Sequence, residues 1–461
     1  MRLTIVFICL TAMAVGLPGR ISAQDEHYAP EPRPLGRELA AFHAPDESDS
    51  TPGAYAPPEE PTGSIDLRTA LALALAHNPD LAAFSWNARA VEGRVLQAAL
   101  RPNPAIGAEV EDIAGTGSYS GVDQAQATIT LSQLIELGGK RARRIRNAAL
   151  ERDLAGWDYE AKRIDVFTAT ATSFIDVLAE QQRVLLAEQA VGLAKQVVRT
   201  SRDRVKAGSS SRAELIKGEV AQASADIERE QALRALAAAR QRLIANWGGT
   251  EPRFKRADGD LTAVRPVPEL ADLRRRVSQN PDLARWATEI MQREAAVALA
   301  RSNAIPDVTL VGGYRYLAGP DESAFVAEVS IPLPLFDRNQ GTVQEALQRV
   351  AQAREEQRST AVRLAAELGA THEALRAAFV QIERLQSAIL PGAAEAFETL
   401  RGGYLEGRFS YLDVLDAQRT LVAARQQHVS ALAEYHRSVA LVERLTGEPL
   451  VADDSTEEPG Q

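Results

Sequence analysis

The tetrapeptide NPDL stands at residues 78–81 and again at residues 280–283, and it marks two similar halves of the chain. Further matches follow in the same order and at nearly the same spacing: Pro104 with Pro306, AGSSSRAEL (207–215) with EGRFSYLDV (406–414), and Gly248 with Gly447. Four matching pairs in one order predict a duplicated unit.

Each unit is predicted to contain the same elements in the same order. Alternating apolar and polar residues predict a strand hairpin in each unit, over 104–111 with 125–131 and 308–314 with 325–333. A helix of moderate length precedes each hairpin, over 66–101 and 269–303. A very long helix follows each hairpin, and a second long helix returns after a glycine turn, over 139–207 with 211–247 and 340–406 with 410–446. A continuous helix of this kind would be roughly 100 Å long, so each is expected to form a coiled coil. Pro391 and Gly192 stand at matching heights of the two long helices, which predicts a kink or a stutter in both.

Composition and charge narrow the class of protein. The chain of 461 residues carries a net charge of −10, so it is poorly suited to binding nucleic acid. Residues 1–23 read as a cleaved signal peptide, with Arg2 before an apolar run and small residues before the cleavage site. The single cysteine, Cys9, lies in this segment, so the exported protein is expected to lack disulfides.

The remaining chain divides by composition and by the repeat. Residues 24–64 are rich in Pro and Glu and are expected to be extended, without a core of their own. The first repeat is assigned to residues 65–264, the second to 265–447, and a C-terminal tail to 448–461. No segment after the signal peptide is predicted to be a transmembrane helix.

Four strands are too few to close a membrane barrel, which needs at least about eight. If the two hairpins enter a membrane, several copies of the chain must therefore share one barrel, and the pattern alone favours neither two copies nor three. The alternative is a water-soluble sheet that packs on one face.

The layout resembles the outer-membrane efflux proteins of the TolC type along residues 65–447. The resemblance rests on the paired NPDL, on LIELGGKR (134–141), on IPLPLFDRNQG (331–341) and on GRFSYLDVLDAQ (407–418). It implies a mainly α protein in which three chains share one β-barrel in the outer membrane and continue as a long helical tunnel in the periplasm. The ELGGKR and PLPLFDRNQG segments are most similar to the branch that serves heavy-metal pumps of the resistance-nodulation-division class. The implied partners are two further copies of the chain, outer-membrane lipid, a periplasmic adaptor and an inner-membrane transporter.

The segment GRFSYLDVLDAQ contains two acids with different local surroundings. Ser410 and Asp413 have the spacing of a helix capping box, and Ser211 and Glu214 repeat it in the first unit. Asp416 lies outside the box, on the same helix face as Asp413. The residue that matches it in the first unit is Lys217, so capping does not account for Asp416.

The resemblance implies a gate at the periplasmic end of the tunnel. Asp413 and Asp416 match the acids that ring the constriction, and Tyr404 matches a tyrosine that ties neighbouring helices together. Glu214 matches the partner acid on the other helical hairpin, and Arg408 lies one position away from the expected arginine. The residues expected to dock the adaptor are those of the two helical turns, namely Gly208, Ser209, Ser210, Ser211, Gly407, Phe409 and Ser410.

Other chemistry is not expected. The basic run Lys140–Arg146 is interpreted as a solvated helix start, or as a segment at the level of lipid headgroups. The six histidines do not cluster with metal-ligand spacing, and no nucleotide or hydrolase motif occurs. We therefore expect no enzymatic activity, no cofactor and no tight metal site. Together with these absences, the resemblance implies a passive, gated conduit for metal cations. The alternatives are the same conduit serving drugs or type I secretion, and a soluble periplasmic scaffold.

Overall fold

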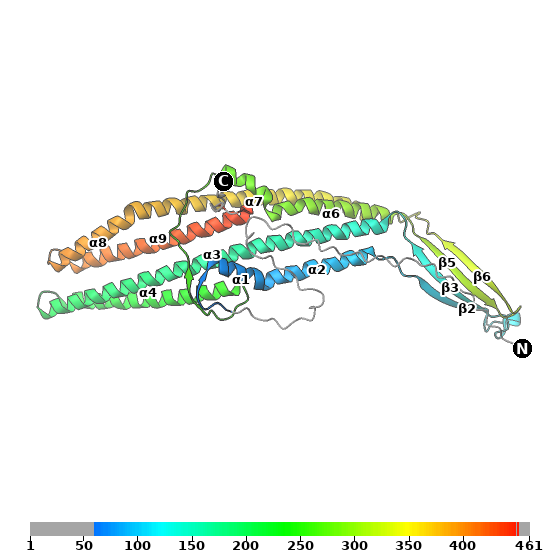
Figure 1. The fold of residues 1–461 in the computed structure, drawn as a ribbon, viewed down its shortest axis with the longest axis horizontal. Coiled ribbons are helices and arrows are strands. Elements are labelled where there is room, and N and C mark those ends of the chain that lie inside the picture. Colours follow the sequence, from blue (N-terminus) through cyan, green and yellow to red (C-terminus); the bar gives the residue numbers. More distant parts are fainter. Residues whose placement is uncertain (1–59, 449, 451–461) are drawn as a thin grey trace, which may run out of the picture.

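The computed structural model describes residues 60–448 and residue 450, which form an elongated, mainly helical molecule (Figure 1). A four-stranded sheet occupies one end, and long helices extend from it to two turns at the other end. The signal peptide, most of segment 24–64 and almost all of the C-terminal tail lie outside the described residues.

The two halves repeat one order of elements. In the first half these are α1 (Leu67–His77), α2 (Pro79–Ala99), β2 (Ala105–Glu111), β3 (Gln126–Ile135), α3 (Lys140–Lys206) and α4 (Arg212–Ala245). In the second half they are α5 (Leu270–Arg276), α6 (Pro281–Asn303), β5 (Val308–Leu317), β6 (Glu322–Ser330), α7 (Gln340–Arg384), α8 (Leu390–Leu405) and α9 (Tyr411–Thr446). Short 3-10 turns lie at Gly117–Tyr119 and Val277–Gln279.

The helix predicted before each hairpin is wrong as a single element, because both are broken at the asparagine of NPDL. Asn78 caps α2, where its side chain accepts a hydrogen bond from the Leu81 amide at 2.8 Å and Pro79 takes the first helical position. Its amide group also donates to the Asn246 carbonyl at the end of α4, at 2.7 Å. Asn280 does the same in the second half, where it donates to the Arg444 carbonyl in α9 at 2.9 Å. Each NPDL segment thus links the first helices of its repeat to the end of the last helix, α4 or α9.

The four-stranded sheet confirms both predicted hairpins. The strand order is β2-β3-β5-β6, and all neighbours are antiparallel. The pairing of β3 with β5 joins the hairpin of the first half to that of the second. Strands β2 and β6 form the edges of the sheet within the chain.

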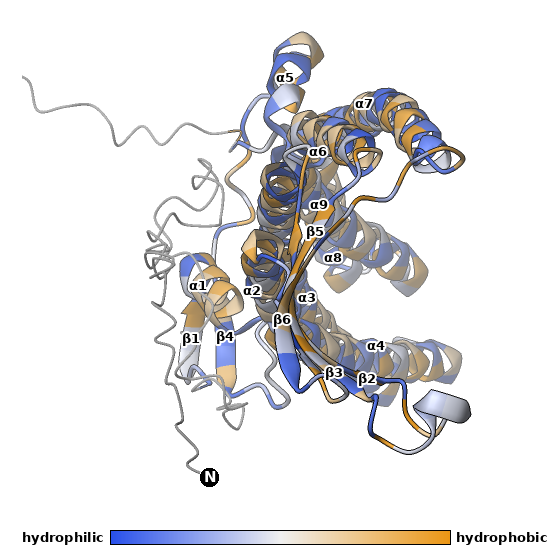
Figure 2. Cartoon of the chain, turned by 90° about the vertical axis from the view of Figure 1, so that its right-hand side faces the viewer, coloured by the Kyte–Doolittle hydropathy of each residue, from blue (hydrophilic) through white to orange (hydrophobic). Residues whose placement is uncertain are grey.

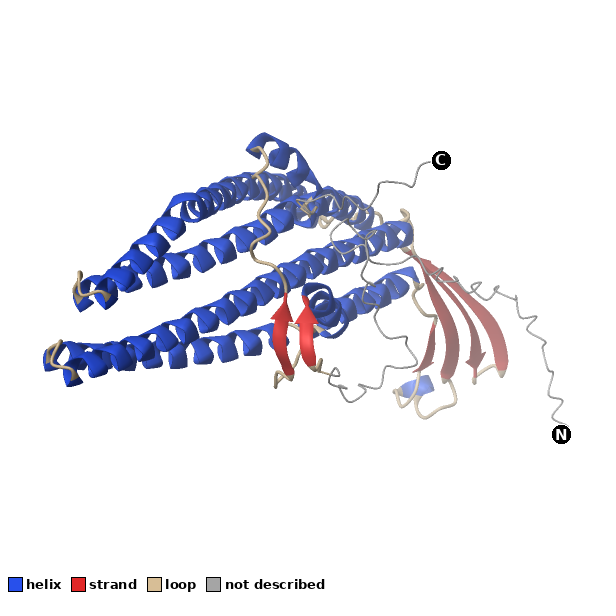
Figure 3. Cartoon of the chain, turned by 60° about the vertical axis from the view of Figure 1, so that its left-hand side comes forward, coloured by secondary structure: helices blue, strands red, loops and turns tan. Residues whose placement is uncertain are grey.

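A second, two-stranded parallel sheet was missed by sequence reasoning. It pairs β1 (Gly63–Asp66) with β4 (Phe254–Asp258) beside the middle of the helical body (Figure 3). Residues 63–64 are therefore a strand and not part of an unstructured segment. The side-chain amide of Gln181 in α3 extends this sheet, because it donates to the Ala257 carbonyl at 2.9 Å and accepts from the Ala257 amide at 2.8 Å.

The predicted long helices and their returning partners are present, and α3 packs against α4 as α8 packs against α9. Helix α3 has 67 residues and passes through Gly192 without a break, so the kink or stutter predicted there does not interrupt the helix. The kink predicted at Pro391 is confirmed as a π-helical turn at Leu385–Ile389, which separates α7 from α8. Viewed along the long axis, the helices follow a curve that is open on one side (Figure 2).

The main hydrophobic core lies where the two halves meet in the middle of the body. Its fully buried members include Leu243 and Trp247 near the end of α4 and Leu364 and Leu368 in α7. Among the described residues, no helix is long and apolar enough to cross a membrane.

Candidate functional site

Two helical turns lie at the same end of the molecule, opposite the sheet (Figures 1 and 3). One joins α3 to α4 and the other joins α8 to α9. Gly208 and Gly407 have φ angles of +72° and +78° in these turns, a left-handed conformation that favours glycine. The structure thus brings the predicted docking residues of both halves to one end of the chain.

The turn between α8 and α9 is fixed by Phe409. Its ring lies directly over Gly403, where a Cβ atom would clash with it. The Gly403 carbonyl accepts a hydrogen bond from the Arg408 amide at 2.7 Å. The Arg408 guanidinium forms an ion pair with Glu406 in the same turn. Arg408 is therefore part of the exposed turn, and the structure does not place it on the predicted gate acids.

Asp413 completes a capping box at the start of α9, as predicted. The Ser410 amide donates to its carboxylate at 2.9 Å, and the Ser410 hydroxyl donates at 2.7 Å. The Asp413 amide in turn donates to the Ser410 hydroxyl at 3.3 Å. The hydrogen bond from the Ser410 side chain, followed by that from its backbone, lowers the pKa of Asp413 below its usual value.

Asp416 is the next acid on the same face of α9 and is exposed. Within residues 60–448, no hydrogen bond or ion pair involves its carboxylate, and only its backbone carbonyl accepts a bond, from Thr420. Asp413 is thus engaged in capping, whereas Asp416 presents its charge to solvent.

Tyr404 and Glu214 meet, and they join the two turns. The buried Tyr404 hydroxyl, at the end of α8, donates to the Glu214 carboxylate in α4 at 3.0 Å. It also lies 3.4 Å from the Ser201 hydroxyl in α3. Arg204 of α3 stacks over the Tyr404 ring at 4.5 Å and donates to the Tyr404 carbonyl at 2.9 Å. Burial first, and then the neighbouring Glu214, raise the pKa of Tyr404, so the hydroxyl remains a donor at neutral pH. We call Tyr404, Glu214, Ser201 and Arg204 the tyrosine latch.

The latch corrects the capping prediction for the first half. Ser211 accepts a hydrogen bond from the Glu214 amide at 3.3 Å, which is half of a capping box. The Glu214 carboxylate does not return to the Ser211 amide, because it accepts from Tyr404 and from the Ser210 hydroxyl. Ser201 and Arg204 were not predicted as site residues. The sequence marks them only by their position in the last turns of α3, just before the first glycine turn.

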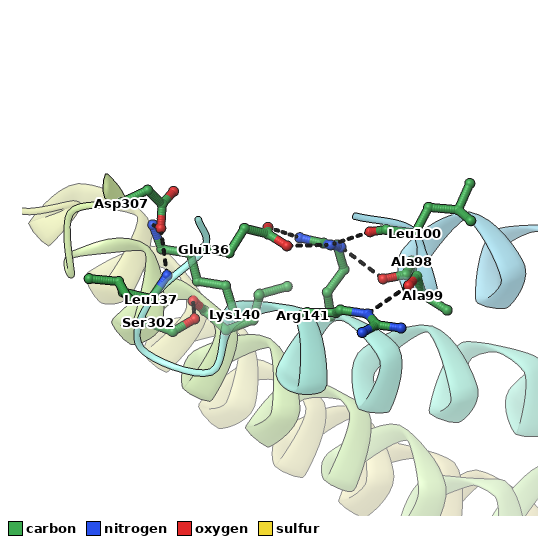
Figure 4. A network of polar contacts seen from close by, with 11 residues as sticks. Ala98, Ala99, Leu100, Glu136, Leu137, Lys140, Arg141, Ser302 and Asp307 are labelled. Carbon is green, nitrogen blue, oxygen red and sulfur yellow. Dashed lines mark hydrogen bonds and ion pairs between the residues drawn. The ribbon is translucent and has the colours of Figure 1, made fainter. Parts of the chain in front are cut away.

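The basic run at the start of α3 is solvated only in part: Arg143 and Arg146 are exposed, as expected for a solvated helix start, whereas Lys140 is buried and Arg141 and Arg144 bind the end of α2. Arg144 forms an ion pair with Glu136 at 2.7 Å and donates to the Ala98 and Leu100 carbonyls at the end of α2. Arg141 donates to the adjacent Ala99 carbonyl at 2.6 Å (Figure 4). These arginines satisfy carbonyls that a helix C-terminus leaves unpaired.

The same segment also joins the two halves next to the sheet. Lys140 is buried and lies 2.7 Å from the Asp307 carboxylate, which precedes β5. Asp307 also accepts a hydrogen bond from the Leu137 amide at 2.9 Å (Figure 4). The ELGGKR segment thus fixes the strands to the helical body.

No group of three His, Cys, Asp or Glu side chains in the described part of the chain is arranged to hold a metal ion. The chemistry of the site is that of exposed carboxylates and hydrogen bonds between helices.

Comparison with known families identifies this architecture. The profile of the family described as Outer membrane efflux protein matches residues 70–249 and 273–448. The chain belongs to the outer membrane efflux protein family. Two matched segments of similar length agree with the repeated order of elements. The family is one of outer-membrane channels rather than enzymes, and membership favours a membrane conduit over a soluble periplasmic scaffold.

Relatives of this efflux protein include several metal-resistance proteins. The cobalt-zinc-cadmium resistance protein CzcC of Cupriavidus metallidurans is 35% identical over 392 residues, which cover 85% of this chain and 92% of that protein. The nickel-cobalt-cadmium resistance protein NccC of Alcaligenes xylosoxydans xylosoxydans is 28% identical over 64% of this chain and 66% of its own length.

Solved structures agree on the fold. A crystal structure of CusC superposes with a TM-score of 0.71 at 18% identity and covers 89% of this chain and 99% of that chain. The outer membrane protein VceC of Vibrio cholerae gives a TM-score of 0.67 at 18% identity, over 84% of this chain and 97% of that chain. The predicted resemblance to TolC-type channels is confirmed, and the efflux protein is assigned to the outer membrane.

Proposed function

We propose that this efflux protein is the outer-membrane conduit of a tripartite pump that exports heavy-metal cations. The observation that carries the proposal is the 35% identity to a cobalt-zinc-cadmium resistance protein along 85% of the chain. The sequence contains no nucleotide-binding motif, so the energy would come from an inner-membrane transporter, reached through a periplasmic adaptor.

The sheet supports an assembly of three copies around a shared barrel. Strands β2 and β6 each leave one edge unpaired within the chain. Open edges are not tolerated in lipid, so β6 of one copy would pair with β2 of the next. Three copies of the four-stranded sheet would give twelve strands. Large apolar side chains, among them Ile106 and Phe325, are 80% and 85% exposed in the single chain and would face lipid.

The exposed acids of α9 would form the gate. Three copies would bring six carboxylates of Asp413 and Asp416 to one level of the tunnel. A ring of carboxylates attracts cations and repels anions. Asp413 keeps its charge, because the hydrogen bonds from Ser410 lower its pKa, whereas the carboxylate of Asp416 has no hydrogen-bond or ion-pair partner among the described residues.

The two turns would dock the adaptor. Leu405, Phe409 and Leu412 are exposed apolar residues beside the turn between α8 and α9. Small and polar residues, Ser209 and Ser210, form the other turn. Apolar side chains on a helical hairpin fit the apolar face of partner helices, which supports helix-to-helix docking.

The substrate is tested by deleting the gene in its host and measuring growth with metals and with organic toxins. We expect greater sensitivity to cobalt, zinc or cadmium, and restoration by the wild-type gene. If only sensitivity to organic compounds rises, the metal assignment is wrong. That outcome would favour the second candidate, an organic substrate, because the pyoverdine export protein OpmQ of Pseudomonas aeruginosa is also 25% identical over 84% of this chain.

The gate is tested in planar bilayers with the double variant Asp413→Ala and Asp416→Ala. We expect a higher single-channel conductance and a weaker preference for cations than in the wild type. Asp413→Ala alone serves as the comparison, since it removes the capping acid and retains Asp416. If the double variant has wild-type conductance and selectivity, the two acids act only at the helix start.

A further inference from the structure

All charged side chains of the four-stranded sheet lie on one of its faces. Glu109 in β2 is paired with Thr128 in β3, and Thr128 with Arg315 in β5, so these three residues share a face. Arg315 is paired with Ala324 in β6. Because side chains alternate between faces, Glu111, Glu322 and Glu328 lie on this face as well. We call it the polar face.

The opposite face carries exposed apolar residues in each strand of the sheet. These are Ile106, Val110, Ile129, Leu131, Leu310, Tyr314, Phe325 and Val329. A sheet with one exposed apolar face and one charged face fits lipid on the first side and water on the second. If the proposed function holds, the polar face lines the conduit.

Arg315 is the only Lys or Arg in these four strands, all of which the structure describes. Its guanidinium extends from β5 across β3 to β2. It donates to the Thr128 hydroxyl at 2.9 Å and to the side-chain amide oxygen of Gln126 at 3.2 Å, and it lies 3.4 Å from the Glu111 carboxylate.

The surrounding groups hold this arginine flat on the sheet. Thr128 is only 3% exposed, although it lies on a face that is open in the single chain, because the side chain of Arg315 covers it. The Gln126 side chain is oriented by its second bond, in which its amide group donates to Asp112 at 2.7 Å. The charge of Arg315 is thus fixed beside Glu111 at the end of the sheet far from the helices.

The contact with Glu111 contributes little to stability. The side chains of Arg315 and Glu111 are 32% and 43% exposed, and ion pairs of such exposure are weak. The contact of Arg315 with Glu111 affects the net charge of the polar face more than it affects stability. Four glutamates and one arginine leave three net negative charges in each copy.

We propose that Arg315 sets the ion selectivity of the sheet end of the conduit by neutralising Glu111. The proposal rests on the proposed function, because it requires the polar face to line the channel. Replacing Arg315 by Gln would leave four net negative charges on this face of each copy, whereas replacing Glu111 by Gln would leave two.

The test is the reversal potential of the purified full-length channel in planar bilayers under a potassium chloride gradient. Arg315→Gln is expected to raise the ratio of cation to anion permeability about two- to fivefold, the range for one partly exposed charge. Glu111→Gln is expected to lower the ratio by a similar factor, and the double variant is expected to return it close to the wild-type value. Arg315→Lys retains the charge and is the matched control, with an expected ratio near that of the wild type.

An unchanged or lower ratio in Arg315→Gln would overturn the proposal. If that variant fails to assemble, Glu111→Gln decides alone, and an unchanged or higher ratio in it also overturns the proposal. A wild-type protein that forms no channel would refute the proposed function instead. The experiment therefore distinguishes a failure of the Arg315 proposal from a failure of the proposed function.

Discussion

Replacing Tyr404 by Phe tests whether the tyrosine latch holds the two helical turns together. The change removes one hydroxyl and keeps the buried ring and its stacking with Arg204. The lost contacts are the 3.0 Å hydrogen bond to Glu214 and the longer 3.4 Å contact with Ser201. Because Glu214 lies in α4 and Tyr404 in α8, the variant weakens a link between the two halves.

The size of the effect follows from the charge on Glu214. A hydrogen bond to a charged group contributes about 1.5–3 kcal/mol. Glu214 is only partly buried and keeps its bond from Ser210, so we expect the lower end, about 1.5 kcal/mol. Since about 1.4 kcal/mol is a factor of ten in an equilibrium constant, the ratio of open to closed channels should rise roughly tenfold if the latch exists only in the closed state.

The measurement is the open probability of single channels in planar bilayers. Tyr411→Phe is the matched control, because within the described residues no hydrogen bond involves the Tyr411 hydroxyl and its ring lies 6.2 Å from that of Tyr404. We expect Tyr411→Phe to behave as the wild type. Equal open probabilities in the two variants would show that the hydroxyl of Tyr404 does not restrain the gate.

The pH dependence gives an independent check on the same residue. The pKa of Tyr404 is raised above its ordinary value, by burial and then by Glu214, so the latch is fully formed below about pH 10. As the pH rises through the raised pKa, the hydroxyl loses its proton beside a carboxylate and the latch is lost. Wild-type channels should therefore open at alkaline pH, and Tyr404→Phe should lack this step. If Tyr404→Phe channels also open over the same alkaline pH range, the opening is caused by the titration of another group.

Three further changes test the contacts around the site by thermal unfolding of the purified protein. Arg144→Ala should destabilise it by about 1–3 kcal/mol, because carbonyls at the end of α2 lose their donor, whereas the exposed Arg146→Ala should have little effect. Gly403→Ala should cost about 1–3 kcal/mol through a clash in the turn, whereas Gly402→Ala has open space and should be neutral or stabilising. Ser410→Ala should cost about 1 kcal/mol because it removes the capping hydroxyl of α9. Equal stability of a variant and its control, or of Ser410→Ala and the wild type, would contradict the corresponding contact.

Periodicity was sufficient to predict the strand hairpins, the long helices and the glycine turns, because each depends on residues close in sequence. The break at NPDL was also predictable, since an asparagine followed by proline is a strong helix start, but the apolar pattern on both sides concealed it. The β1–β4 sheet was not predictable, because its strands have four and five residues and their partners are distant in the chain.

The contacts of single side chains were the least predictable part of the site. Residues Tyr404 and Glu214 are separated by 190 positions, so only the packed arrangement of α4 and α8 brings them together. The same holds for Arg144, whose charge suggested solvent but whose guanidinium reaches the end of α2. Sequence patterns specify which face of a helix is polar, and they do not specify which polar group it meets.

The two turns show how a duplicated unit acquires one function from two similar halves. Ser211 and Ser410 both cap a helix, and both are followed three residues later by an acid. The shorter Asp413 closes its own capping box, whereas the longer Glu214 extends to Tyr404 of the other half. The same position therefore serves a local cap in one half and a link between the halves in the other. The next acid, Asp416, has Lys217 at the matching position of the first half, so only the second half has a carboxylate at this position. Duplication explains why the two turns lie at one level, and these side-chain differences explain why one half can supply the charge while the other restrains it.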